Sequence, residues 1–318
     1  MLSGTSLDLL LLVGGIVALY GGAELLVAGA GRLALGIGLH AATVGVTVIA
    51  FATTAPELFV SAIGALRVSS DIGLGTIVGS NIANIGLVLG VATLIKPLQI
   101  SDQVIRRHVP VMVLAALLLV ALGANGRVGR LEGVLLLVVL AGFTAMILHY
   151  ANAESAPMID EPDASAASGV SARAWDGALV IGGLVVLVIG SRWLVAGGTG
   201  LLSALGVSDL VIGLTVLALG TSLPELAASV VGAIRGHESF AVGNVVGSNI
   251  YNILAVLGIV ALITPIEIEP ATLRFELPIM VAFTVLLVGL MGYRRQLTRL
   301  DGVILVGSYV GFIALLVP

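Results

Sequence analysis

Two segments of the sequence place a glutamate directly after a proline inside a long apolar stretch. They read Ala-Phe-Ala-Thr-Thr-Ala-Pro-Glu over residues 50–57 and Ala-Leu-Gly-Thr-Ser-Leu-Pro-Glu over residues 218–225. Burying a carboxylate in a bilayer costs at least about 2.5 kcal/mol, so Glu57 and Glu225 are candidates for function. Proline cannot donate a backbone hydrogen bond, and we expect the carbonyl four residues before each proline to be freed. At membrane depth such a carbonyl needs a partner, and a cation could be that partner.

A second polar motif, Gly-Ser-Asn-Ile-x-Asn, occurs over residues 79–84 and again over 247–252. Its serine and its last asparagine lie four residues apart, on one face of a helix. Together the motifs offer two carboxylates, several hydroxyls, two amides and freed carbonyls, all of them hard oxygen donors. Ca²⁺ takes about 6–8 such oxygens in irregular geometry, and two carboxylates balance its charge. The candidate side chains are Glu57, Glu225, Asn84, Asn252, Thr53, Thr54, Ser80, Thr221, Ser222 and Ser248.

Other residues of these motifs have structural interpretations. Asn81 and Asn249 fall on a different helical face, where interhelical hydrogen bonds are expected. Gly79 and Gly247 are expected to let helices approach closely. The sequence has no cysteine, which excludes disulfides and thiolate metal sites.

The elements that position these residues are membrane helices. The chain has 318 residues, of which 58% are hydrophobic and 10% charged, and its mean hydropathy is +1.18. Soluble domains carry about 25% charged residues, and the continuously apolar runs here have the length of about 20 residues that a spanning helix needs. We predict an all-α integral membrane protein with about ten transmembrane helices. The predicted spans are 8–30, 41–66, 72–95, 108–124, 131–150, 176–202, 209–234, 240–263, 275–292 and 301–317.

The two halves of the chain are related by duplication. A shift of 168 positions places Pro56-Glu57-Leu58 on Pro224-Glu225-Leu226 and each Gly-Ser-Asn-Ile-x-Asn motif on the other. Five helices per repeat is an odd number, so the repeats must have inverted topology, which places a substrate site at their interface. We predict a first repeat over 1–150 with its motif region at 41–97, a linker over 151–174, and a second repeat over 175–318 with its motif region at 209–265.

Loop charges predict the orientation. Lys and Arg concentrate on the side that includes the acidic, hydrophilic linker, and this side is expected to be cytoplasmic. Both termini are then outside, in the cell membrane. Glu24 lies within the first span, and the shift of 168 positions places it on Arg192. Its side chain could have a gate role near the helix end or could snorkel to the membrane surface.

These motifs resemble the two α-repeats of the cation/calcium exchanger superfamily, in particular its sodium/calcium exchanger branch of prokaryotic type. The signature Gly-Thr-Ser-x-Pro-Glu stands intact at 220–225 and in variant form at 52–57. The resemblance covers essentially the whole chain. It implies Na⁺/Ca²⁺ antiport by alternating access, three Na⁺ for one Ca²⁺ and electrogenic, with no cofactor. The partners are Na⁺, Ca²⁺ and the lipid bilayer, without nucleic acid, and the expected functional unit is a monomer.

The resemblance also implies roles for individual residues. Glu57 and Glu225 would be ligands shared by Ca²⁺ and Na⁺, and the hydroxyl residues would complete flanking Na⁺ sites together with the carbonyls of Ala50 and Ala218. The first and sixth helices would slide across a static core. Two departures stand out: Thr54 replaces the motif serine, and Asn252 is neutral where some relatives, including the potassium-dependent branch, have Asp. The neutral residue argues against K⁺ co-transport.

Several other functions compete with Na⁺/Ca²⁺ exchange. In an H⁺/Ca²⁺ antiporter the same two glutamates would be protonated instead of binding Na⁺, but the Gly-Asn-x-x-Glu pattern of the proton-coupled branch is not found. Mn²⁺ or Mg²⁺ could replace Ca²⁺. A passive cation channel could share the ligands, although an enclosed, charged site favours binding over rapid escape. An intramembrane hydrolase is disfavoured because no zinc-protease motif or nucleophile elbow is present.

Overall fold

The computed structural model describes residues 4–37, 43, 45–67, 70–153, 170–205 and 220–316. In the first half, helices (α), π-helical segments (η) and two-residue strands (β) follow in the order α1 (Gly4–Ile37), η1 (Gly45–Ile49), α3 (Ala50–Thr53), α4 (Ala55–Arg67), α5 (Ser70–Ala83), η2 (Asn84–Leu89), α6 (Gly90–Ile95), β1 (Leu98–Gln99), η3 (Val104–His108), α7 (Val109–Gly123), β2 (Arg127–Val128) and α8 (Arg130–Ala153).

The second half follows a similar order where it is described. It contains α9 (Val170–Ala204), α12 (Leu223–Ile234), α13 (Glu238–Tyr251), η5 (Asn252–Leu257), α14 (Gly258–Ile263), β3 (Ile266–Glu267), α15 (Pro270–Arg274), α16 (Glu276–Arg294), β4 (Gln296–Leu297) and α17 (Arg299–Leu316). The all-α prediction is therefore confirmed, with four two-residue strands as a small addition.

The membrane spans agree with the sequence prediction where the chain is described. Eight helices there are long and apolar enough to cross a membrane, and a ninth candidate is the pair 45–53 and 55–62, which is bent by 44°. The predicted span 209–234 lies partly outside the described residues. α8 runs to Ala153 and α9 begins at Val170, so helix occupies both ends of the predicted linker, and residues 154–169 lie outside the described part.

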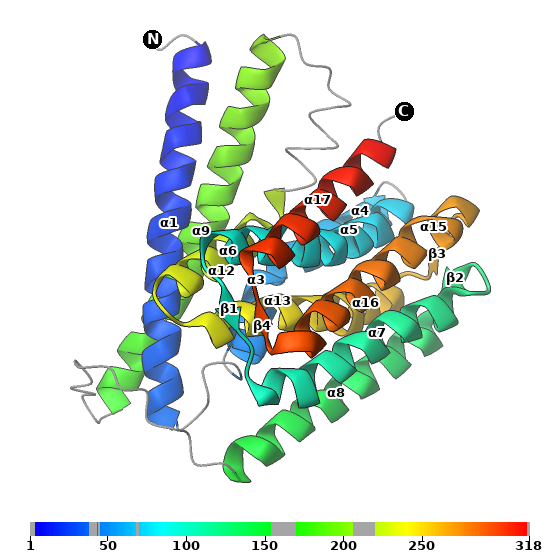
Figure 1. Cartoon of the computed structure of the whole chain (residues 1–318). Helices are drawn as coiled ribbons and strands as arrows, with labels where there is room; N and C mark the ends of the chain where they lie inside the picture. Colours follow the sequence, from blue (N-terminus) through cyan, green and yellow to red (C-terminus); the bar gives the residue numbers. More distant parts are fainter. Residues whose placement is uncertain are drawn as a thin grey trace.

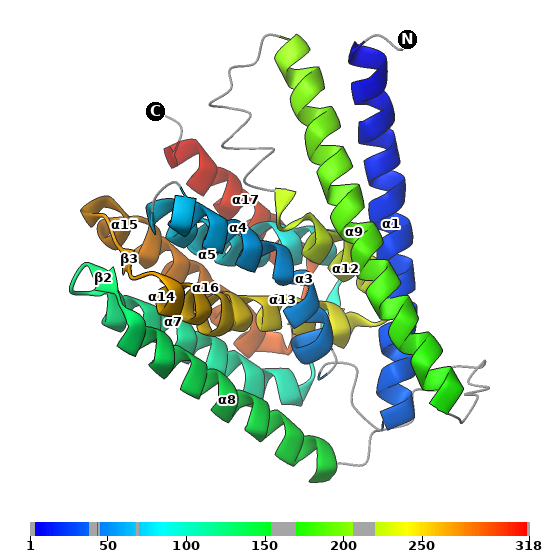
Figure 2. The ribbon, with the colours of Figure 1, turned by 180° about the vertical axis from the view of Figure 1, so that it is seen from behind.

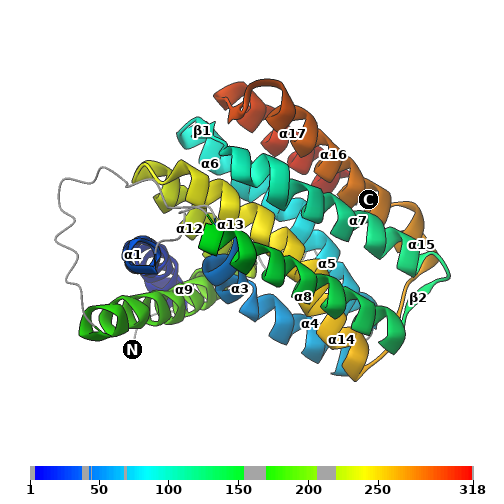
Figure 3. The same cartoon turned by 90° about the horizontal axis from the view of Figure 1, so that it is seen from below.

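Two long helices stand beside a tilted bundle. α1 and α9 run next to each other at a steep angle to the other helices, as the front and back views show (Figures 1 and 2), and the view from below separates this pair from the stacked bundle (Figure 3). Their backbones almost touch, because a Cβ on Gly22 would lie 2.9 Å from the carbonyl oxygen of Gly183 and a Cβ on Gly183 would lie 2.7 Å from that of Gly22. Glycines of this kind permit close packing of membrane helices.

The bundle has a buried centre and an apolar outer face. In an apolar stretch of 18 residues within each span, 83% of the residues are buried in Glu238–Ile263 and 78% in Gly73–Ile95, against 22% in Arg130–Tyr150. The outer helices instead expose large apolar side chains such as Leu131 at 82% and Val17 at 66%. An exposed apolar surface of this extent is suited to lipid, and the two central spans are the ones that carry the Gly-Ser-Asn-Ile-x-Asn motifs.

Two short ladders join the repeats to each other. β1 pairs antiparallel with β4, and β2 pairs antiparallel with β3. In the repeat alignment β1 corresponds to β3 and β2 to β4, so each ladder joins a strand of one repeat to the non-equivalent strand of the other. The flanking bonds follow the same symmetry, since Ile100 N donates to Arg295 O and Ile268 N donates to Gly126 O. The ladders therefore tie the central bundle together across the repeat boundary.

Candidate cation site

The first acidic segment folds as two helices that meet at a bend beside its proline. α3 ends at Thr53 and α4 begins at Ala55. Thr54 N donates to Ala50 O at 3.0 Å, and Leu58 N donates to Thr54 O at 3.2 Å, so helical bonding continues on both sides of the break. Glu57 lies in the first turn of α4 and is completely buried.

The second acidic segment makes a turn at Thr221 and Ser222 before α12 begins. Glu225 lies in the first turn of α12 and is also completely buried. The carbonyl freed by Pro224 is that of Gly220, and it accepts a hydrogen bond from the Ser191 hydroxyl of α9. A hydroxyl of α9 therefore already partners this carbonyl, and a cation ligand role for it stays a prediction.

The last asparagine of each Gly-Ser-Asn-Ile-x-Asn motif begins a π-helical segment. α5 ends at Ala83 and η2 starts at Asn84, and α13 ends at Tyr251 and η5 starts at Asn252. A π-helical turn shifts the side chains that follow it relative to the preceding α-helix, and such turns occur often at functional sites. The same irregularity in both repeats places both asparagines at a change of helical pitch.

Elements of the two repeats cross at the site. α4, which carries Glu57, packs against η5 of the second repeat, and α12, which carries Glu225, packs against η2 of the first. α3 packs against α13, the helix that carries Ser248. The structure thus brings the elements that carry both glutamates and both polar motifs together at the repeat interface.

Many buried polar atoms here have no hydrogen-bond partner among the described residues. Leaving such atoms unpaired costs about 1–3 kcal/mol each, and more for charged groups, so a hard cation fits this set as the group that pairs its oxygens. The described residues contain no cluster of three or more His, Cys, Asp or Glu, so the donors are two carboxylates and neutral groups. The unpaired atoms belong to both carboxyls of Glu57 and Glu225, the amides of Asn84 and Asn252, and the hydroxyls of Thr54, Ser222 and Ser248.

The remaining predicted residues differ in detail. Ala50, Thr53 and Ser80 are buried at the same place, whereas Thr221 is partly exposed. Ala218 lies outside the described residues.

Two expectations about neighbouring motif residues can be compared with the structure. Among the described residues, the amides of Asn81 and Asn249 each donate to the carbonyl four residues earlier in their own helix, at Ile77 and Val245, in place of the expected interhelical bonds. Gly247 does allow close packing, since a Cβ there would lie 2.6 Å from Val46 O.

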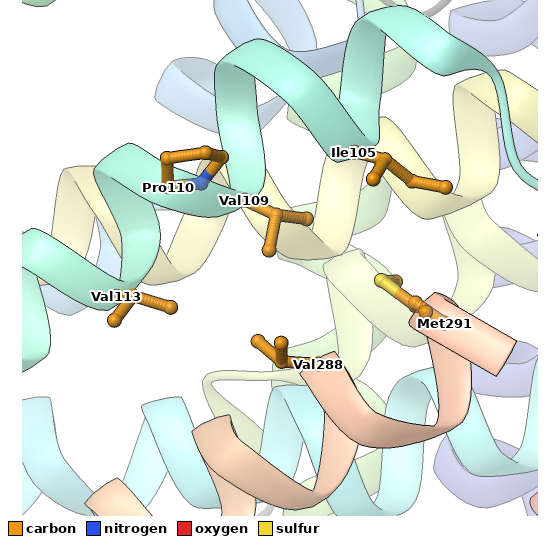
Figure 4. A pocket seen from close by; sticks show the side chains of 7 residues that line it. Ile105, Val109, Pro110, Val113, Val288 and Met291 are labelled. Atoms are coloured by element: carbon orange, nitrogen blue, oxygen red, sulfur yellow. The ribbon is translucent and has the colours of Figure 1, made fainter.

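A separate groove lies on the outside of the bundle, between η3–α7 and α16. It has a volume of about 350 Å³, and Figure 4 shows its apolar lining of Ile105, Val109, Pro110, Val113, Val288 and Met291. None of the predicted ligands lines it, and its apolar side chains offer a cation no oxygen ligands. The groove is therefore distinct from the candidate cation site.

Sequence reasoning missed Asn244 and Ser191. Asn244 is completely buried and lies four residues before Ser248 and eight before Asn252, so one polar helical face was the signal that could have found it. Ser191 lies in an apolar run without a motif, and no local pattern marks it.

An all-helical membrane bundle of two inverted repeats, with buried unpaired oxygen atoms from both at their interface, is the architecture of a secondary transporter. The family model described as sodium/calcium exchanger protein matches residues 7–149 and 175–317. The chain therefore belongs to the sodium/calcium exchanger family, and it is a multi-pass membrane antiporter of that family. The family resemblance predicted from the motifs is confirmed.

Relatives and solved structures agree with this assignment. The chain is 38% identical over 277 residues to the putative antiporter CaxA of Alkalimonas amylolytica, covering 85% of this chain and 86% of the relative. It is 30% identical over 313 residues to the sodium/calcium exchanger MaX1 of Methanosarcina acetivorans, covering 86% and 88%. A solved structure of the sodium-calcium exchanger NCX_Mj, soaked with 10 mM Na⁺ and zero Ca²⁺, matches with a TM-score of 0.82 and 28% identity, covering 98% of this chain and 99% of that one.

Proposed function

We propose that this chain exchanges Na⁺ for Ca²⁺ across the cell membrane by presenting one oxygen-lined site to the two sides in turn. The observation that carries the proposal is the pair Glu57 and Glu225, which come from opposite repeats, are completely buried, and have no hydrogen-bond partner among the described residues. Two carboxylates balance one divalent ion, and the neutral oxygens around them suit Ca²⁺ and Na⁺.

Exchange follows from competition for these carboxylates. Ca²⁺ and Na⁺ both need Glu57 and Glu225, so occupancy by one ion excludes the other. Flanking Na⁺ sites are completed by the hydroxyls of Thr53, Thr54, Ser80, Thr221, Ser222 and Ser248, by the amides of Asn84 and Asn252, and by the carbonyls of Ala50 and Ala218. Unpaired carboxylates are costly to enclose at low dielectric. The protein without a bound ion therefore rarely changes from one access state to the other, and the two ion movements stay coupled.

The moving part in this proposal is the pair α1 and α9. These helices pack against each other and both contact α12, while the bundle behind them is tied by two ladders. A shift of the pair across the bundle would uncover the site on one side and cover it on the other.

The remaining features of the proposal concern topology and coupling. The two repeats are residues 1–150 and 175–318, joined by a cytoplasmic linker, with both termini outside and the monomer as the functional unit. Exchange is electrogenic, with three Na⁺ for one Ca²⁺. It is independent of K⁺ because Asn84 and Asn252 are both neutral.

The test uses purified protein in liposomes loaded with Na⁺ and diluted into Na⁺-free buffer containing ⁴⁵Ca²⁺. Uptake should require internal Na⁺, continue when a protonophore collapses any pH gradient, and disappear in Glu57→Gln and Glu225→Gln. Glu276→Gln is the matched control, because Glu276 at the start of α16 also has a buried oxygen without a partner among the described residues but is not in the proposed site. That variant should retain uptake.

Other outcomes identify the alternatives. Uptake driven by a pH gradient alone, without internal Na⁺, would make H⁺ the coupling ion at the same glutamates. Ca²⁺ entry without Na⁺ exit would indicate a channel. If coupling is three for one, each cycle moves one positive charge outward, so an inside-positive potential set with K⁺ and valinomycin should accelerate Ca²⁺ uptake.

A further inference from the structure

Asn244 of α13 joins the two acidic segments through its amide. Its Nδ2 lies 3.0 Å from Ser229 Oγ and 3.4 Å from the backbone oxygen of Glu225. Its Oδ1 lies 3.5 Å from Thr53 Oγ1 in the other repeat. One buried side chain thus contacts α12 of the second repeat and α3 of the first.

The hydrogen-bond chemistry fixes which way this amide points. The backbone oxygen of Glu225 can only accept, so the group facing it must be the amide NH₂. Its two hydrogens are then used by Glu225 and Ser229, and the Oδ1 atom is left facing Thr53. Asn244 therefore offers the Thr53 hydroxyl an acceptor.

A hydroxyl that binds a cation must direct its lone pairs toward the ion and its hydrogen elsewhere. Thr53 Oγ1 lies within hydrogen-bond distance of three protein acceptors, Ile49 O at 3.0 Å, Ala50 O at 3.4 Å and Asn244 Oδ1 at 3.5 Å. Of these, Asn244 alone comes from the opposite repeat. Through this contact and its bonds to Glu225 and Ser229, Asn244 fixes α3 of one repeat relative to α12 of the other.

Close backbone packing makes this contact possible. A Cβ on Gly45 would lie 2.7 Å from Phe240 O, and a Cβ on Gly247 would lie 2.6 Å from both Val46 O and Ala50 Cβ. Phe240 and Gly247, where these approaches occur, lie on either side of Asn244 along α13, so the helix is pressed against η1 and α3 on both sides of the amide. In the repeat alignment Thr76 takes the place of Asn244, so the two halves of the site are not chemically equivalent here.

We propose that Asn244 is a positioning residue for ion exchange, holding the Thr53 hydroxyl of one repeat and the Glu225 segment of the other in register so that Thr53 can bind Na⁺. The inference rests on the proposed function, because it takes Thr53 as an ion ligand. It adds a residue that binds no ion itself and sets the affinity of the site for Na⁺ more than for Ca²⁺, since Ca²⁺ depends chiefly on the two carboxylates.

The experiment compares Asn244→Leu with Asn249→Leu in the liposome assay, measuring KM for Na⁺ and for Ca²⁺ separately. Asn249 is a matched control on the same helix, equally buried, whose amide bonds within that helix at 3.0 Å. Loss of one buried hydrogen-bond network corresponds to about a tenfold change in a binding constant. Asn244→Leu should raise the KM for Na⁺ about tenfold and change that for Ca²⁺ by less than about threefold, while Asn249→Leu should leave the ratio of the two unchanged.

A second pair of variants tests whether the effect passes through Thr53. Thr53→Val alone should raise the KM for Na⁺, and adding Asn244→Leu to it should have little further effect, because the hydroxyl being held is already gone. If Asn244→Leu does not fold, Asn244→Thr takes its place, with the residue that the other repeat carries. Equal changes in both KM values, or full additivity with Thr53→Val, would overturn the proposal. Absence of Na⁺-dependent uptake in the unsubstituted protein would instead reject the proposed function.

Discussion

Glu24 of α1 forms an ion pair with Arg235, the residue that follows α12. Arg235 Nη2 lies 2.8 Å from Glu24 Oε2, and Arg235 Nε lies 3.0 Å from both carboxyl oxygens. The repeat alignment places Glu24 on Arg192 and Arg235 on Arg67. The equivalent pair in the other half is therefore Arg192 and Arg67, whose like charges repel, whereas Glu24 and Arg235 attract each other.

This asymmetry predicts that the charges favour the conformation seen here over the opposite access state, in which the contacts of the two repeats are exchanged. The side chains of Glu24 and Arg235 are 24% and 55% exposed, so solvent screens the pair and it changes the population ratio by at most roughly fivefold. Glu24→Gln and Arg235→Gln should each shift the ratio by up to this amount, and the exchange Glu24→Arg with Arg235→Glu should restore it.

Spin labels can measure this shift directly, because the chain has no native cysteine. Labels at Val17→Cys on α1 and Leu131→Cys on α8 would report the distance between the outer helix pair and the bundle, and both positions are exposed. Identical distance distributions in the single variants and the unsubstituted protein would show that the ion pair does not bias the two conformations.

The hydrogen bond from Ser191 to Gly220 predicts a cost for removing one hydroxyl. Ser191 is buried, and its hydroxyl donates to the Gly220 carbonyl, to which Pro224 cannot donate because it has no N–H. Ser191→Ala should destabilise the protein by about 1–2 kcal/mol, seen as a lower melting temperature in detergent. Ser191→Thr should retain most of the stability. Ser203→Ala, at an exposed serine on the same helix, is the control and should have little effect. A melting temperature unchanged by Ser191→Ala would mean that water satisfies the carbonyl.

The repeats and most of the site could be predicted from the sequence because their signals are local or periodic. Continuous apolar runs identify spans, and polar residues that recur at a shift of 168 positions identify Glu57, Glu225 and their motifs. Contacts between distant segments have no such signal. Ser191 and Gly220 lie 29 residues apart and Glu24 and Arg235 lie 211 apart, and neither pair shares a motif.

The π-helical turns at Asn84 and Asn252 illustrate a second limit. A π-turn differs from an α-turn by one residue in the hydrogen-bond register, and the apolar residues that follow each asparagine suit both. Packing of η2 against α12 and of η5 against α4 joins segments of different repeats, and spacing along one helix does not reveal it.

Backbone conformation predicts different effects for two glycine substitutions, one beside a ladder and one within a helix. Gly126 precedes β2 with φ of +86°, and its carbonyl accepts the bond from Ile268. A side chain in this left-handed region costs about 1–2 kcal/mol, so Gly126→Ala should lower the melting temperature. Gly142 lies within α8, and a Cβ there would meet no described atom within 4 Å. Gly142→Ala should therefore be neutral or stabilising by up to about 1 kcal/mol. Equal destabilisation by both would contradict the backbone argument.

Adding a third carboxylate at the site should make Ca²⁺ affinity depend on pH. Asn252 is completely buried and both atoms of its amide lack a partner among the described residues. In Asn252→Asp the new carboxyl is neutral when protonated and resembles the original amide at low pH. At higher pH it loses its proton and adds a negative charge, which favours a divalent ion over Na⁺. The KM for Ca²⁺ should therefore fall between pH 6 and pH 8 more steeply in this variant than in the unsubstituted protein. Asn249→Asp adds the same charge to α13 on a different face and should not reproduce the effect; parallel pH profiles for both variants would place Asn252 outside the ion site.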